Sequence, residues 1–277
     1  MKKTLNPIFL IVSIITIFTA CNKSHLSPDD GDVNVLKSFS SDFDEMSRVE
    51  IYENIGEWHN DYQDFILTKL TNSNLTLSSE DVFYDSLYLW SVDFYSDKNI
   101  IFNQNEFEMH FINGMEEDEE ITYIEDFSST ANDIVLSLVN EMDKFDESSL
   151  LDYILSIENE VYSLSVESEF VVVASFVSTL KSSLLYWNEE VDYWTDKIME
   201  NNYPFDIYSS NNNNERKVDV DLKKLVGADA RGAIRGAFGG GGLGPGGAMA
   251  GGVLGGAAYS TGNLLYQIGK DLISKKK

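Results

Sequence analysis

The chain has 277 residues, of which 43% are hydrophobic and 12% aromatic, enough for a packed core in one large or two small domains. Its formal net charge of -26 argues against nucleic acid as a partner, because phosphate contacts supply most of the affinity of nucleic-acid-binding proteins. The single cysteine excludes an intrachain disulfide and a cysteine-rich metal site.

The N-terminal residues 1–20 have the pattern of a signal peptide. Lys2 and Lys3 precede an uncharged apolar run over residues 8–18, shorter than the roughly 20 apolar residues of a transmembrane helix. The run ends in Phe-Thr-Ala-Cys, and this ending resembles the lipobox of bacterial lipoproteins. The resemblance implies that Cys21 is acylated and becomes the mature N-terminus, so that the protein is held on a membrane of the bacterial cell envelope, the outer one in preference to the inner. An ordinary secretory signal peptide is the alternative.

The middle of the chain is predicted to be mainly α-helical. Residues 21–35 are polar and are expected to form a flexible tether. No proline occurs between Pro28 and Pro204, and apolar residues recur there at spacings of three and four. Helices are expected over residues 49–70, 80–95, 132–145, 150–164 and 170–198. The last has a strict heptad pattern that predicts a narrow packing seam, although its β-branched start, residues 170–177, leaves a strand as the alternative. These helices are expected to form an acidic helical bundle over residues 36–205.

Charge divides the chain into two parts. Residues 22–205 hold 8 basic and 40 acidic side chains, whereas residues 206–277 hold 10 basic and 6 acidic ones. Between the two parts lies an asparagine-rich segment that is typical of a linker. We therefore expect a linker over residues 206–218 and a separate tail over residues 219–277.

The tail is rich in glycine at a regular spacing. Sixteen of the nineteen glycines lie between Gly227 and Gly269, and no charge occurs from Gly236 through Gly269. Every fourth residue from Ala228 to Ser260 is small, a spacing that lets helix backbones approach closely in lipid. The predicted helix-packing and membrane-contacting residues are Gly232, Gly236, Gly240, Gly244, Gly252 and Gly256. We expect a helical hairpin, with helices over residues 221–238 and 245–272.

Two further resemblances concern the tail and a motif near the start of the first helix. The tail is similar to the glycine-zipper segments of membrane-active bacterial peptides, including two-peptide bacteriocins, which implies association with a membrane. The motif N-x-G-x-x-H-N is formed by Asn54, Gly56, His59 and Asn60. Together with the lipobox and the tail, it looks like a set of uncharacterised bacterial lipoproteins, a likeness that implies no particular activity.

His59 is the residue most able to carry chemistry. It is predicted at the margin of an apolar helix face, where a histidine can bind a metal or move a proton. The alternative is a partly buried histidine that hydrogen-bonds a neighbour, with Gly56 allowing a close helix contact. His25 and His110 are the other histidines, and no two are at helical spacing, so no metal site is expected. No catalytic residue and no cofactor are predicted, because nucleophile and phosphate-binding motifs are missing.

These observations predict a non-enzymatic lipoprotein of the cell envelope. Cys21 would anchor it, the acidic bundle would contact a protein partner, and the tail would associate with a membrane. A membrane-disrupting toxin, or its antagonist, is the first alternative. A periplasmic enzyme that uses His59 is the second.

Overall fold

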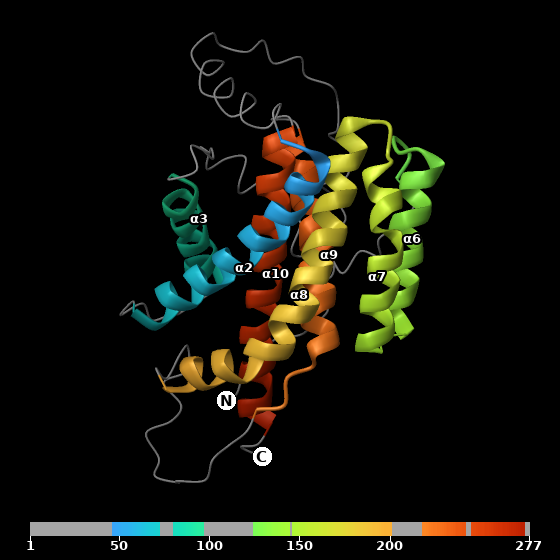
Figure 1. Cartoon of the computed structure of the whole chain (residues 1–277). Helices are drawn as coiled ribbons and strands as arrows, with labels where there is room; N and C mark the ends of the chain where they lie inside the picture. The colour runs from blue at the N-terminus through green and yellow to red at the C-terminus, as the bar shows by residue number, and fades with distance from the viewer. Residues whose placement is uncertain are drawn as a thin grey trace, which may run out of the picture. The chain divides into compact units, whose positions relative to one another are not determined.

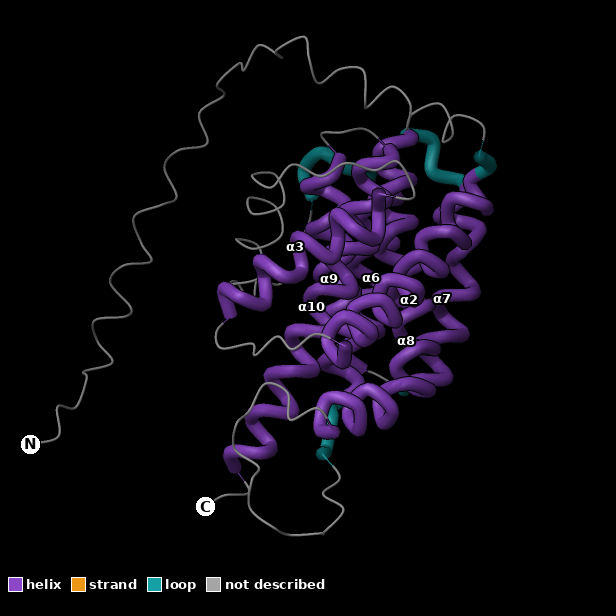
Figure 2. Tube along the Cα trace, turned by 90° about the vertical axis from the view of Figure 1, so that its left-hand side faces the viewer, coloured by secondary structure: helices purple, strands orange, loops and turns teal. Residues whose placement is uncertain are grey.

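In a computed structural model, the protein is described over residues 46–72, 80–96, 124–144, 146–200, 218–241 and 245–274. Seven helices occupy these ranges, and no strand occurs in them (Figures 1 and 2). The helices are α2 (Arg48–Asn72), α3 (Glu80–Ser96), α6 (Ser129–Lys144), α7 (Glu147–Tyr162), α8 (Glu167–Glu200), α9 (Leu222–Gly241) and α10 (Pro245–Ser274). The predicted mainly α fold is confirmed, and the helix boundaries differ from the predicted ones by at most three residues.

The first residues of two helices explain where these helices begin. At α2, the backbone N–H of Ser47 donates to Oε2 of Glu50 (2.7 Å) and the N–H of Glu50 donates to Oγ of Ser47 (3.3 Å), which is a capping box. These bonds to Ser47 lower the pKa of the Glu50 carboxyl. At α10, Pro245 occupies the first helical position, where its missing N–H leaves no unsatisfied donor.

Helix α8 is the central helix of the unit. It packs against α2, α6, α7, α9 and α10, and Figure 1 shows α6 and α7 on one side of it and α2 on the other. Every residue from Glu169 to Leu180 is buried. The predicted narrow seam is therefore wrong for this part of the helix, because a helix with neighbours on all sides buries all of its faces.

The same helix passes a test for membrane-spanning segments by length and composition. Among the described residues, α8 is the helix that is both long and apolar enough to cross a bilayer, and 83% of its apolar window is buried inside the protein. A buried core helix can pass the same test, because the test considers only length and composition.

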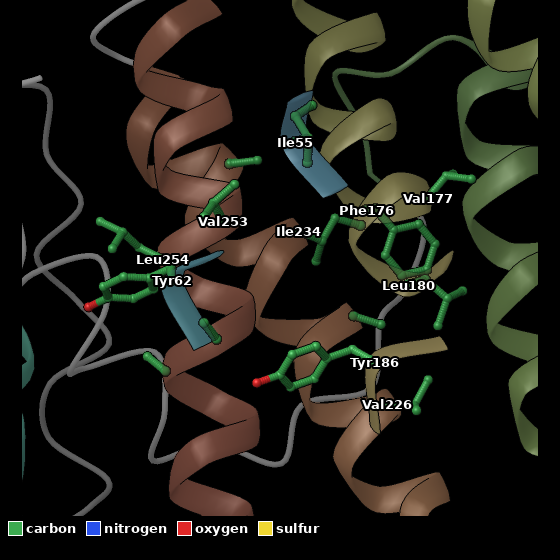
Figure 3. Close-up of a cluster of buried hydrophobic side chains, with 14 of the residues drawn as sticks. Ile55, Tyr62, Phe176, Val177, Leu180, Tyr186, Val226, Ile234, Val253 and Leu254 are labelled. Carbon is green, nitrogen blue, oxygen red and sulfur yellow. The ribbon is translucent and has the colours of Figure 1, made fainter. Parts of the chain in front are cut away.

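The glycine-rich hairpin of α9 and α10 is part of the same compact unit as the acidic helices. Both of its helices pack against α8, and α10 also packs against α2. Figure 3 shows Val226, Ile234 and Val253 of the hairpin among apolar side chains of α2 and α8. This finding corrects the expected division into a domain over residues 36–205 and a separate tail over residues 219–277. The two parts differ in charge but share one core.

Several predictions fall on residues that are not described. They concern the signal peptide 1–20, the lipid site Cys21, the tether 21–35, nearly all of the linker 206–218, and Gly244. These stay predictions.

Candidate functional site

Seven polar side chains from four helices meet in the core, and we call them the Asp229 cluster. Each of them has no exposed surface. The members are His59 and Gln63 of α2, Ser183 and Trp187 of α8, Asp229 of α9, and Ser260 and Thr261 of α10. Burying a polar group costs free energy unless the group is hydrogen-bonded. The contribution of this cluster to stability therefore depends on how completely its polar atoms are paired.

The carboxylate of Asp229 accepts hydrogen bonds on both oxygens. His59 Nε2 lies 2.9 Å from Oδ1, and Gln63 Nε2 makes a longer contact of 3.4 Å with the same oxygen. Ser183 Oγ (2.5 Å) and Trp187 Nε1 (2.6 Å) donate to Oδ2. An ionised carboxylate only accepts, so Nε2 of His59 carries a proton in this arrangement. One carboxylate on α9 thereby ties α2 and α8 to the hairpin.

Gln63 extends the cluster to α10. Its Nε2 donates to Oγ of Ser260 (2.6 Å), and its Oε1 accepts from Oγ1 of Thr261 (3.1 Å). The side-chain amide therefore uses both its donor and its acceptor inside the core. Through Gln63, both helices of the hairpin are joined to α2 by polar contacts that apolar packing alone would not specify.

Glycines make room for the cluster and for its helices. A methyl group placed on Gly256 would lie 3.2 Å from Cδ2 of His59 and 2.9 Å from Cγ2 of Thr179. On α2, a methyl group on Gly56 would overlap with the side chain of Ser182 on α8. The predicted close helix contact at Gly56 is therefore present.

The predicted glycines of α9 contact α10 as expected, whereas the glycines of α10 form two sets that contact different helices. Methyl groups on Gly232 and Gly240 would overlap with the backbone of α10, at Gly255 and Gly247. On α10, the glycines that meet the backbone of α9 are Gly251 and Gly255, opposite Gly236 and Gly232. Gly252 and Gly256, one residue further along, meet the side chains Ser175 and Thr179 of α8. Small residues therefore serve two neighbours, the partner helix of the hairpin and α8.

His59 lies in the centre of the core, not at the margin of an apolar face as predicted. The helical pattern of α2 alone shows one apolar face, but α2 packs against both α8 and α10, and the second contact covers the side that carries His59. Asn60, the next residue, is half-buried, and its Oδ1 lies 3.1 Å from Nδ1 of His59. The two residues of the motif therefore lie side by side, with His59 inside and Asn60 nearer the surface.

Sequence reasoning missed Asp229 and its donors. The available signal was that Asp229 is the single acidic residue from 222 to 270, in the middle of the small-residue pattern. A lone carboxylate in such a segment requires donors from another element. Nothing in the local pattern around Gln63 or Ser183 identifies them as those donors.

Asn60 also lines an open cleft between α2 and α8, with a volume of about 590 Å³. Four other lining residues are Asp64, Tyr186, Glu189 and Glu190. The rest of the lining is Leu67, Thr68, Thr71, Leu185, Tyr193 and Lys197. The cleft and the Asp229 cluster are therefore joined by one side chain, Asn60.

Hydrogen bonds fix one carboxylate of the cleft. The Tyr186 hydroxyl donates to Oδ1 of Asp64 (2.7 Å) and accepts from Nε1 of Trp194 (2.8 Å). Burial, with the bond to Asp64 as the next cause, raises the pKa of Tyr186. The phenol therefore stays protonated and keeps its donor for Asp64.

The cleft carries three carboxylates and one cation. Asp64, Glu189 and Glu190 are the carboxylates, and Lys197 is the cation. Lys197 is already paired with Glu200, with Nζ 2.7 Å from Oε2. The uncompensated charge of the cleft is therefore negative.

Comparisons of the chain with protein families, with curated proteins and with solved structures gave no match. Within the described residues, no group of three or more histidine, cysteine, aspartate or glutamate side chains is arranged to hold a metal ion. The site must therefore be interpreted from its own geometry.

Proposed function

We propose that the protein is a non-enzymatic, lipid-anchored contact protein of the bacterial cell envelope, and that its contact site is the acidic cleft between α2 and α8. The observation that carries the proposal is the contrast between the two polar sites. The Asp229 cluster is sealed and its polar atoms bind one another, whereas the cleft is open and has unmatched negative charge.

The sealed cluster supports a structural role for His59. A general base must come within hydrogen-bonding reach of its substrate, and His59 has no exposed surface. Its Nε2 faces Asp229 and its Nδ1 faces Asn60, so both ring nitrogens have a partner within the chain. We infer that the cluster fixes the order and orientation of the four helices.

The packing of the hairpin supports membrane attachment through Cys21 in preference to the tail. The glycines of α9 and α10 that were expected to face other helices in lipid already contact each other and α8 within the protein. Inserting this hairpin into a bilayer would separate Asp229 from His59, Ser183 and Trp187. That leaves the predicted acyl group on Cys21 as the anchor.

The attachment is tested by mass spectrometry of the mature N-terminus and by fractionation of the native chain beside Cys21→Ala. We expect a lipid-modified Cys21 at the N-terminus and release of the variant from the membrane fraction. Circular dichroism of the variant controls for its fold. A variant that stays on the membrane would point to the hairpin, and leakage of anionic vesicles caused by the native chain would favour the membrane-disrupting alternative.

A further inference from the structure

The cleft between α2 and α8 has an aromatic and apolar side as well as an acidic one. Tyr193 is 52% exposed and Leu185 is 46% exposed, although both are large apolar side chains. Both line the cleft, together with the buried Leu67 and Tyr186. Such a surface suits a ligand whose body is apolar and whose end carries charge.

On the acidic side of the cleft, hydrogen bonds hold one carboxylate in a fixed orientation. Asp64 is held through Oδ1 by the Tyr186 hydroxyl, which is itself held by Trp194 Nε1. A carboxylate fixed in this way loses little conformational freedom when it receives a ligand, and it has a second oxygen with which to accept. Glu189 and Glu190 line the same cleft and add to its negative potential.

The chain itself places a cation on the aromatic side. Lys197 Nζ lies 5.7 Å from the centroid of the Tyr193 ring, within the range of a cation–π contact. This contact is an independent observation that an ammonium group is accommodated beside this ring. A ligand cation at the cleft would use the same kind of contact.

We propose that the cleft binds a basic segment of a protein partner, with one lysine or arginine side chain paired to Asp64 and its stem on Tyr186 and Tyr193. The proposal rests on the proposed function and names the chemistry of the contact. The cleft is open and its volume of about 590 Å³ exceeds that of a single side chain, so a length of chain can cross it. The excess of 40 acidic over 8 basic side chains in residues 22–205 attracts such a segment from a distance.

Titration calorimetry on the full chain tests the proposal, with a blocked nonapeptide that holds three arginines spaced by glycine and serine. The matched control peptide has glutamates in place of the arginines, and spermidine tests a small cation. Asp64→Asn keeps an acceptor for Tyr186 and should weaken binding of the arginine peptide about tenfold, the loss expected for a charge-assisted hydrogen bond. Tyr193→Ala removes an exposed ring and should weaken binding about threefold.

The control variant is Asp152→Asn, which changes the net charge by the same amount on an exposed part of α7, outside the cleft. It should change the affinity less than about twofold. The proposal is overturned if the arginine peptide does not bind, or if Asp152→Asn weakens it as much as Asp64→Asn does. Binding of spermidine as tight as that of the peptide would overturn the protein-segment part. Because the titration does not depend on the lipid, its outcome is separate from the test of Cys21.

Discussion

The α9–α10 hairpin and the region around α2 and α8 pack in different ways. Between α9 and α10 the contact is backbone to backbone, because glycines on each helix face the peptide groups of the other. Around α2 and α8 the core holds large side chains, among them Ile55, Tyr62 and Phe176, all of them buried (Figure 3). The contact between α9 and α10 leaves no space for added atoms, whereas removing a large side chain around α2 and α8 leaves a cavity. Atoms added to the glycines should therefore destabilise the hairpin, and truncation of a large buried side chain should destabilise the region around α2 and α8.

The largest expected effect is that of Gly232→Ala. The new methyl group would overlap with the carbonyl oxygen of Gly255, and a backbone atom cannot move aside as a side chain can. We expect the loss of most of the folding free energy, which is about 5–15 kcal/mol for typical domains. Urea unfolding followed by circular dichroism measures it. A variant as stable as the native chain would show that the hairpin contact is looser than described.

The next largest effect is expected for Phe176→Ala, in the region around α2 and α8 that large side chains fill. Phe176 is fully buried on α8, so its removal leaves a cavity, and a loss of about 3–5 kcal/mol is expected. The same unfolding experiment measures it. A loss below about 1 kcal/mol would mean that the neighbouring side chains close the cavity.

His59→Ala should cost about 3 kcal/mol, because it leaves the buried carboxylate of Asp229 with one donor fewer. This cost is larger than that expected for a histidine at the margin of an apolar face. Asn60→Ala is the control, because Asn60 is half-buried and touches the same ring on its other nitrogen. We expect it to cost less than about 1 kcal/mol. Equal losses for the two variants, measured by thermal unfolding, would contradict the central role given to the His59 contact with Asp229.

The smallest effect should be a gain. Gly241 is the last residue of α9, and a methyl group placed on it would meet no atom within 4 Å. Gly241→Ala should therefore raise the free energy of unfolding by up to about 1 kcal/mol, because alanine loses less conformational freedom than glycine. It is the matched partner of Gly232→Ala, with the same change on the same helix. A loss at Gly241 as large as that at Gly232 would show that flexibility, and not close contact, explains the glycines.

The helices could be predicted from the sequence, but their neighbours could not. Spacings of three and four are a local signal, and they located α2, α8 and the two helices of the hairpin to within a few residues. Burial depends on what packs against each face. The contact of α10 with α2 buries His59, and the contact of α10 with α8 places Gly252 against α8; no pattern within one helix contains that information. The asparagine-rich segment misled for the same reason, since a change of composition along the chain does not require a separate core.

The Asp229 cluster also has a consequence for how the chain folds. His59 and Asp229 are 170 residues apart, and Gln63 and Thr261 are 198 apart. Helical proteins usually fold fast because most of their contacts are local, whereas contacts at such separations close only after the rest of the chain has been brought together. During synthesis, α2 and α8 emerge before their partners on α9 and α10 exist. Because α9 and α10 follow α2 and α8 in the chain, they complete the core late, and a chain that stops short of them leaves the buried face of α8 open to aggregation.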